Sequence, residues 1–117
     1  MTYSTAMDTA LIALAEPRRR RILEVLRDRE LSVGEIAAHF EVTRPAISQH
    51  LGVLKQAGLL EERREGTRHL YRFRPQGLAD VYAYLDAFWA DGLQRLKLQA
   101  ELEERITRAT EEGNRPR

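Results

Sequence analysis

The chain has 117 residues with 19 basic and 18 acidic side chains, so its formal net charge is only +1 and charge arguments must be local. It contains no cysteine, which excludes disulfides, thiolate metal sites and cysteine nucleophiles. The length is that of one ordinary domain, and the longest apolar run, residues 10–15, is far below the roughly 20 residues that a membrane helix needs. We therefore expect a single domain over residues 1–117 that is soluble, cytoplasmic and not inserted in a membrane.

The first two predicted helices are separated by a proline. Apolar residues predict a first helix over about residues 5–15, and Pro17 interrupts it. Proline suits the first turn of a helix because its missing N–H would have no partner there, so a second helix is expected from Pro17 to about Asp28. The basic run Arg18–Arg21 on this helix is interpreted as a solvated face or, alternatively, as a phosphate contact.

Two further helices follow in the arrangement of a helix-turn-helix. Ser32 and Glu35 have the spacing of a capping box, in which each side chain bonds a backbone N–H of the other, and this predicts a third helix over about residues 33–40. Thr43 is expected to cap a fourth helix, which Gly58 ends. Apolar residues at i, i+4 and i+7 mark the face of this helix that should be buried. They are Ile47, Leu51 and Leu54.

Residues 59–74 change to the alternating pattern of a β-hairpin. Aromatic residues and a histidine alternate with basic residues on the second arm, and Glu65-Gly66 is expected to form the tight turn between the arms. Arg63, Arg64 and Arg68 make the tip of this hairpin basic.

One long helix is expected from about residue 78 to residue 110. At 1.5 Å per residue it would be roughly 50 Å long, which exceeds the diameter expected for the rest of the domain. So long and so apolar a helix needs a second surface to cover it, and the simplest cover is another copy of the chain. The residues expected in this dimer interface are Leu78, Tyr82, Leu85, Phe88, Trp89, Leu93 and Leu96.

A helix-turn-helix over about residues 33–57 followed by a basic hairpin, or wing, over about residues 59–74 is typical of DNA-binding proteins. The second helix of this motif presents a polar face to the major groove, where Gln can bond adenine, Arg can pair with guanine and Ser can serve either base. Arginine also suits a narrow minor groove. The candidate DNA contacts are Arg44, Pro45, Ser48, Gln49 and His50 on the helix and Arg63, Arg64 and Arg68 on the wing. For His50, a role inside the domain is the alternative.

Two other classes of function compete with DNA binding. A winged helix can act as a protein-interaction module without DNA binding, but such a surface should present apolar anchors, whereas Arg44, Ser48 and Gln49 are polar. No enzyme is expected, since the sequence holds no phosphate loop, no cysteine and no cluster of His with carboxylates. Its three histidines are too scattered for a ligand triad, so no metal and no cofactor are expected.

Five stretches, residues 13–23, 33–37, 44–51, 54–59 and 65–71, together resemble the ArsR/SmtB family of bacterial winged-helix repressors. The resemblance covers about residues 10–98. It implies a mainly α fold with a small β-hairpin wing, and a homodimer built on the first helix, including Leu11, and the last helix. It also implies binding to an inverted-repeat operator in double-stranded DNA and repression of transcription, often of the repressor's own operon.

The chain differs from the metal-sensing members of the family that it resembles. Their best-known site pairs two cysteines in the third helix, and another common site uses Asp and His in the last helix. This chain has no cysteine, and no histidine follows His69. It is therefore more similar to the metal-independent, autorepressor-like members, and its effector, operator sequence and regulated genes stay open.

Overall fold

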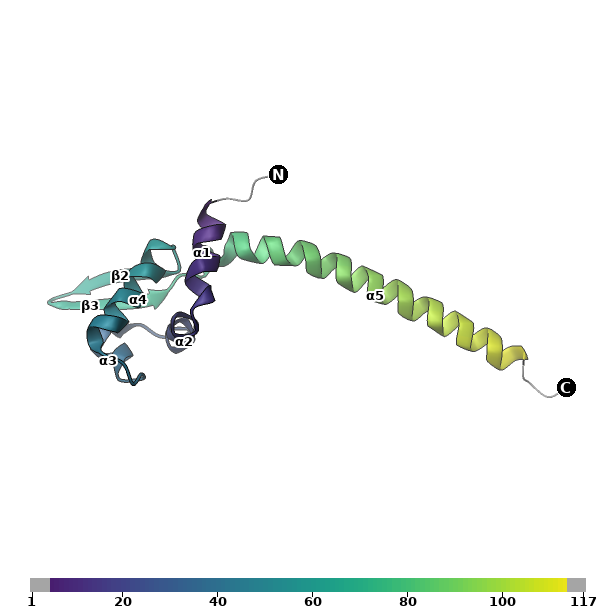
Figure 1. Ribbon diagram of the computed structural model, residues 1–117, viewed down its shortest axis with the longest axis horizontal. Coiled ribbons are helices and arrows are strands. Elements are labelled where there is room, and N and C mark those ends of the chain that lie inside the picture. Colours follow the sequence, from purple (N-terminus) through teal and green to yellow (C-terminus); the bar gives the residue numbers. More distant parts are fainter. Residues whose placement is uncertain (1–4, 114–117) are drawn as a thin grey trace. The chain divides into compact units, whose positions relative to one another are not determined.

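The computed structural model describes residues 5–113 (Figure 1). The elements, in chain order, are α1 (Thr5–Ala15), α2 (Pro17–Val25), β1 (Leu31–Ser32), α3 (Val33–Ala37), α4 (Arg44–Gln56), β2 (Leu60–Glu65), β3 (Arg68–Phe73), the 3₁₀ turn η1 (Pro75–Leu78) and α5 (Ala79–Gly113). Helices dominate, with one small three-stranded sheet, which confirms the predicted fold class. The chain divides into two compact units, of which the first ends at Tyr82 and the second begins at Ala83.

The core of the first unit is built from one apolar face of each helix around α4. The face of α4 that was expected to be buried is fully covered, because Ile47, Leu51 and Leu54 are each 0% exposed. Other large side chains that are almost wholly buried come from the neighbouring elements: Ile22, Leu26, Ile36 and Leu59. The helix-turn-helix therefore packs on a hydrophobic core that a single chain supplies.

Side-chain caps fix where α3 and α4 begin. Ser32 Oγ accepts a hydrogen bond from the Glu35 N–H, and the Glu35 carboxylate accepts one from the Ser32 N–H at 3.0 Å, so the predicted capping box is confirmed. Thr43 Oγ1 accepts from the Ala46 N–H, as expected. Each cap satisfies a backbone donor that the first turn of a helix leaves without a partner.

Two helices are shorter than the sequence predicts. The second ends at Val25 rather than near Asp28, and the third ends at Ala37 rather than at Phe40. At both ends the backbone tightens to bonds between residues three apart, for example from the Phe40 N–H to the Ala37 carbonyl at 3.0 Å. Such 3₁₀-type turns satisfy the last carbonyls of a helix and stop its regular propagation.

The corner between α1 and α2 gives two arginines of the basic run a structural role. Arg19 Nε donates to the Ala13 carbonyl at 2.7 Å, and Arg20 Nη1 donates to the Leu14 carbonyl at 2.6 Å. These carbonyls lie in the last turn of α1, where they have no partner within the helix. Both side chains therefore cap α1, a role that neither interpretation of the run had foreseen.

The sheet has the strand order β1-β3-β2, with antiparallel pairing throughout. The hairpin was expected, but the pairing of the two-residue β1 with β3 was not predicted. The predicted turn is also wrong by one residue. Glu65 pairs with Arg68 in the ladder, so the two-residue loop is Gly66-Thr67. Gly66 takes the first loop position with φ +62°, a conformation that favours glycine in tight hairpins.

Two glycines let the chain pass closely behind α4. Gly58 ends this helix with φ +77°, as the sequence predicts. A Cβ atom on Gly77 would lie 2.1 Å from the Gly58 carbonyl oxygen, so only glycine fits at this crossing. The same carbonyl accepts a hydrogen bond from Arg74 Nη1 at 3.2 Å. Gly77 itself belongs to η1, so the crossing lies within this turn.

The long last helix is present but has different bounds from those predicted. It begins at Ala79, and Leu78, which was expected in this helix, belongs to the preceding 3₁₀ turn. It extends to Gly113 rather than ending near residue 110. Many of its large apolar side chains are exposed: Tyr82, Leu85, Phe88, Trp89, Leu93, Leu96, Leu98, Leu102 and Ile106. Within residues 5–113, no helix combines the length and the apolarity that crossing a bilayer requires.

Candidate nucleic-acid interface

The first turns of α4 present the polar face that the sequence predicts. Arg44, Pro45, Ser48 and Gln49 are all exposed, while Ile47 between them is buried. This division follows from the helical period, because residues one turn apart share a face. The polar side chains are thus held on a rigid helix and stay free to meet a ligand.

The fifth candidate on α4, His50, faces the interior of the unit. Its side chain is 18% exposed, and its Nε2 lies 4.0 Å from the Glu16 carboxylate. On the other side of the ring, Nδ1 lies 3.5 Å from Arg19 Nη1. The imidazole therefore connects α4 to the corner between α1 and α2. This arrangement favours the alternative role inside the domain over contact with DNA.

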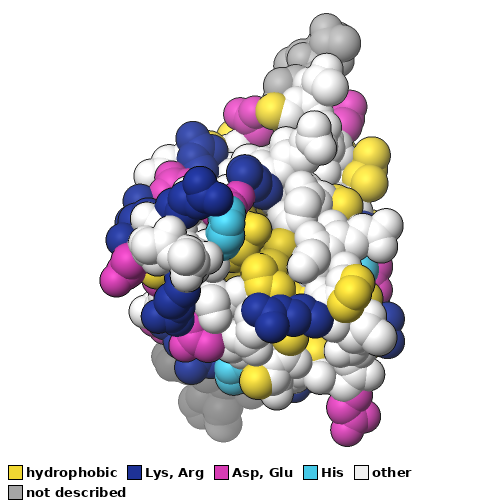
Figure 2. All heavy atoms as spheres, turned by 90° about the vertical axis from the view of Figure 1, so that its left-hand side faces the viewer, with side chains coloured by type: hydrophobic (Ala, Val, Ile, Leu, Met, Phe, Trp, Pro, Cys, Tyr) yellow, Lys and Arg dark blue, Asp and Glu magenta, His cyan; other side chains and the backbone are white. Residues whose placement is uncertain are grey.

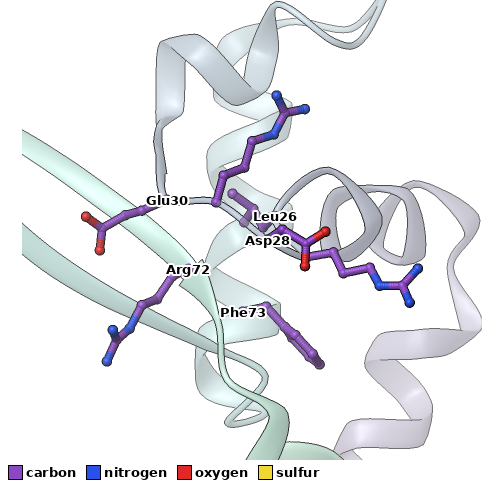
Figure 3. Close-up of a pocket in the computed structure, with 7 residues that line it drawn as sticks. Leu26, Asp28, Glu30, Arg72 and Phe73 are labelled. Atoms are coloured by element: carbon purple, nitrogen blue, oxygen red, sulfur yellow. The ribbon is translucent and has the colours of Figure 1, made fainter.

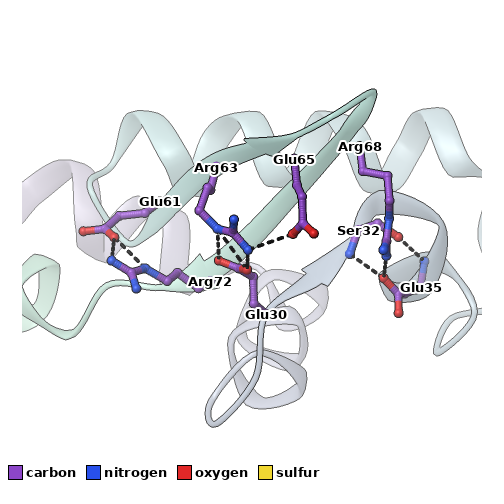
Figure 4. A network of polar contacts seen from close by, with 8 residues as sticks. All are labelled: Glu30, Ser32, Glu35, Glu61, Arg63, Glu65, Arg68 and Arg72. Carbon is purple, nitrogen blue, oxygen red and sulfur yellow. Dashed lines mark hydrogen bonds and ion pairs between the residues drawn. The ribbon is translucent and has the colours of Figure 1, made fainter.

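Two of the wing arginines lie on one face of the hairpin and pair with carboxylates (Figure 4). Arg63 donates through Nε and Nη2 to Glu30 and through Nη2 to Glu65. Arg68 donates to Glu35 at 2.6 Å. The hydrogen bond to Glu30 is the main reason that the pKa of the Arg63 guanidinium is raised. No sequence signal pointed to Glu30 or Glu35, since each lies 33 residues along the chain from its arginine.

The third wing arginine lies on the opposite face of the hairpin. Arg64 alternates with Arg63 along β2 and pairs in register with His69 of β3. Its side chain is exposed, and within residues 5–113 it takes part in no ion pair or hydrogen bond. Of the three nominated wing cations, this guanidinium is the one available without displacing a carboxylate.

A hollow of about 280 Å³ lies between the start of α4 and the wing. It brings together one candidate from each element, Arg44 and Arg68, and the lining also includes Ser32, Val33, Thr67 and His69. The Arg44 guanidinium also lies against α3, because a Cβ atom on Gly34 would be 3.3 Å from Arg44 Nη2. Two guanidinium groups around one hollow suit an anionic group such as phosphate.

Figure 2 shows the distribution of charged side chains on the surface that carries α3 and the wing. Lysine and arginine side chains gather on this face, with acidic side chains set between them. The net charge of the whole chain conceals this pattern, since basic and acidic residues nearly balance. A surface on which arginine side chains gather is a common feature of nucleic-acid binding.

A cluster of Lys55, Glu62 and His69 joins the hairpin to α4, on the face of the hairpin opposite Arg63. Glu62 accepts a hydrogen bond from Lys55 of α4, and its carboxylate also contacts His69 Nδ1. The bond from Lys55 is the leading cause that lowers the pKa of Glu62. Sequence reasoning missed this cluster because its members come from three elements. It links the wing to the helix that carries the polar face.

Within the described part of the chain, no three His, Asp or Glu side chains come close enough together to hold a metal ion. The described site consists of the exposed polar face of α4 and the arginine-bearing wing. These features define the class of the protein, a winged helix-turn-helix DNA-binding protein.

Comparisons with known proteins agree with this class. Residues 16–62 match the family model described as bacterial regulatory protein, arsR family. The chain is 49% identical to the HTH-type transcriptional regulator Rv2034 of Mycobacterium tuberculosis, over 80% of this chain and 87% of the relative. It is 36% identical to the transcriptional repressor SdpR of Bacillus subtilis, over 63% of this chain and 82% of the relative.

Solved structures show the same fold. A crystal structure of a possible transcriptional regulator for arsenical resistance matches with a TM-score of 0.62 and 45% identity, covering 82% of this chain and 96% of that one. The homodimeric winged helix-turn-helix DNA-binding domain Mb0332 of Mycobacterium bovis matches with a TM-score of 0.59 and 33% identity, covering 77% and 83%. The chain belongs to the arsR family of bacterial regulatory proteins, and it is a DNA-binding transcriptional regulator.

Proposed function

We propose that the protein is a homodimeric repressor that binds an inverted-repeat operator, including one in its own operon, without a metal effector. The observation that carries the proposal is the exposed polar face of α4 beside a hollow lined by arginines from both α4 and the wing. We place its action on the chromosome in the cytoplasm and assign it no catalytic step.

The proposed contacts divide between bases and phosphates. Gln49 and Ser48 stand on the exposed face of α4, where a helix in the major groove meets base edges. Arg44 and Arg68 converge on the hollow and would hold a phosphate, which fixes the register of the helix on the duplex. Arg64 on the wing would contact the adjacent backbone or minor groove.

The proposal of a homodimer rests on the exposed apolar side chains of α5. Tyr82, Leu85, Trp89 and Leu93 recur at i, i+3, i+7 and i+11, the spacing of a continuous stripe on one helix face, and Leu96 continues it. Tyr82 and Trp89 are 70% and 67% exposed. A solvated stripe of this size is unfavourable in a single chain. The Mycobacterium bovis relative is homodimeric, which supports a second copy as the cover.

Leu11 of α1 is proposed as a further contributor to this interface. It is 38% exposed, and its neighbour Ile12 is 67% exposed. Two-fold symmetry would then place two copies of α4 about 34 Å apart, which is one turn of DNA, over the two halves of an inverted repeat. Covering a promoter in this way would block transcription, and the related protein SdpR is a repressor.

The test is fluorescence anisotropy with the DNA immediately upstream of the protein's own gene, beside a scrambled duplex of the same composition, across a salt series. We expect tight binding to the upstream DNA, clearly weaker binding to the scrambled duplex and a steep salt dependence, because each phosphate contact releases counterions.

Equal, weak binding to both duplexes would contradict control of its own operon. Absence of binding to either duplex even at low salt would contradict the DNA-binding mode as a whole. That result would favour the alternative of a winged-helix module that binds proteins.

A further inference from the structure

We propose that Glu30 and Glu35 limit the affinity of this protein for DNA of arbitrary sequence, because their carboxylates compete with phosphate for Arg63 and Arg68. The two acidic residues would thereby lower the sequence-independent part of the affinity without touching a base. This inference rests on the proposed contact between the wing and DNA.

Glu30 is placed by the segment that leads from α2 into β1. This segment runs past β3 beside a hollow of about 370 Å³, whose lining includes Leu26, Glu30, Arg72 and Phe73. Figure 3 shows the Glu30 side chain leading away from Leu26 toward the strands of the hairpin. There both of its carboxylate oxygens lie 3.2 Å from Arg63 Nε, and Nη2 also donates to the same carboxylate.

The geometry of the ion pair between Arg63 and Glu30 determines how Glu30 competes with DNA phosphate for this guanidinium. Two parallel N–H groups of one guanidinium facing one carboxylate form the same fork that a phosphate would use. Glu30 is the more enclosed partner, with a side chain 24% exposed against 55% for Arg63. A phosphate that used this same fork of Nε and Nη2 would therefore have to displace the Glu30 carboxylate from Arg63.

Glu35 has two simultaneous tasks. Its Oε1 accepts from the Ser32 N–H in the capping box of α3 and also from Arg68 Nη2 at 2.6 Å. The wing is thus joined to the start of the helix-turn-helix through an acidic residue that lies beside the arginine-lined hollow. A carboxylate at this point reduces the positive potential that a phosphate would meet.

The same row of ion pairs supplies a matched control. Glu61 lies on β2 and pairs with Arg72 and Arg74, neither of which is a nominated DNA contact. Glu61→Gln removes one negative charge from the face of the hairpin that Glu30 contacts (Figure 4), and it does so without releasing Arg63 or Arg68.

The experiment measures binding of the full chain to a 30-base-pair duplex of mixed sequence by fluorescence anisotropy at low and at moderate salt. We expect Glu30→Gln and Glu35→Gln each to tighten binding about two- to fivefold, the range set by exposed ion pairs. The gain should shrink as salt screens the charges. Glutamine also completes a capping box, so Glu35→Gln should keep α3 intact. Thermal unfolding of each variant verifies that it is folded.

A second comparison isolates the arginine. In an Arg63→Ala background, Glu30→Gln should no longer tighten binding, because the cation that it releases is absent. A gain that persists in this background would overturn the proposal. So would a gain of equal size in Glu61→Gln, since net charge alone would then explain the effect. Unchanged or weaker binding by folded Glu30→Gln and Glu35→Gln would also overturn it, and would assign these carboxylates to holding the arginines in position for DNA.

Arg64→Ala separates failure of this inference from failure of the proposed function. Its guanidinium has no carboxylate partner in the described chain, so its loss should weaken duplex binding if the wing contacts DNA at all. If Arg64→Ala weakens binding and the glutamine variants change nothing, only the competition by Glu30 and Glu35 is refuted. If Arg63→Ala, Arg64→Ala and Arg68→Ala all leave binding unaltered, the wing does not contact DNA and both proposals for it fall.

Discussion

The two units of this chain treat their apolar side chains in opposite ways. In the first unit, Ile47, Leu51 and Leu54 of α4 are fully buried, and polar side chains occupy the exposed face of the same helix. In α5, Trp89 and Leu96 are 67% and 63% exposed. The contrast shows which surfaces a single chain completes by itself. The polar face of α4 is supported by buried side chains of its own unit, whereas large apolar side chains of α5 are exposed.

The largest effect is expected from breaking the surface that a single chain leaves uncovered. Trp89→Glu would place a charge in the proposed dimer interface twice, once from each copy, and an unpaired buried charge costs several kcal/mol. We therefore expect the variant to sediment as a monomer at concentrations where the wild type sediments as a dimer. Analytical ultracentrifugation over a concentration series measures this difference.

A control for this variant lies on the same helix. Gln94→Glu adds an equal charge five positions further on, about 140° around the helix from Trp89. Its association should match that of the wild type. Dimers of unchanged stability in Trp89→Glu would show that the exposed stripe of α5 is not the interface.

A somewhat smaller loss is expected from the surface that the chain completes by itself. Leu51→Ala removes a fully buried side chain from beneath the polar face of α4, and such truncations destabilise a core by about 2–5 kcal/mol. Urea unfolding followed by circular dichroism measures the change. Val53→Ala on the same helix is the control, because Val53 is 36% exposed. Equal losses of unfolding free energy in the two variants would mean that burial of the apolar face does not stabilise α4.

The third prediction concerns the exposed polar face of α4. Gln49→Ala should weaken binding to the upstream DNA by about 1–3 kcal/mol, since a paired side chain contributes this much to discrimination between bases. Binding to a scrambled duplex should hardly change. Fluorescence anisotropy with the two duplexes separates the effects. A parallel loss on both would mean that Gln49 contacts the backbone and reads no base.

Local sequence signals anticipated the features of the first unit that depend on neighbours along the chain. The capping box of Ser32 and Glu35, the cap at Thr43 and the buried stripe of α4 each involve residues within about two helical turns. A pattern of this length is visible in the sequence because the helical period brings its members together. The exposed polar side chains of α4 follow from the same period.

The features that sequence reasoning missed depend on contacts between distant segments. Strand β1 has only two residues and exists because β3 pairs with it. Glu30 and Glu35, which pair with Arg63 and Arg68, each lie 33 residues away from their partner, so no spacing rule could identify them. His50 faces the interior because Glu16 and Arg19, at another corner of the fold, lie beside it. In each case tertiary packing, rather than local propensity, determines the result.

The smallest expected effect is a pH dependence of stability, which should arise from Glu62 in the first unit and not from the exposed carboxylates of α5. Hydrogen bonds hold the pKa of Glu62 below its ordinary value of 4.5, chiefly through Lys55 and then through His69. The folded state therefore favours the charged carboxylate. This stabilisation is complete above the unfolded pKa and is lost as pH falls through the lower, folded value. Since exposed ion pairs contribute at most about 1 kcal/mol, the change should be modest.

Urea midpoints measured from neutral pH to below pH 4.5 test this expectation. The wild type should lose stability as the pH falls through this range, and Glu62→Gln should lose less, because its side chain has no proton to gain. Glu101→Gln removes the same charge from an exposed position on α5 and should leave the wild-type pH profile unaltered. If Glu62→Gln followed the wild-type profile, the cluster joining the wing to α4 would contribute nothing to stability, and the position of the wing would depend on the sheet and on the carboxylate partners of its arginines.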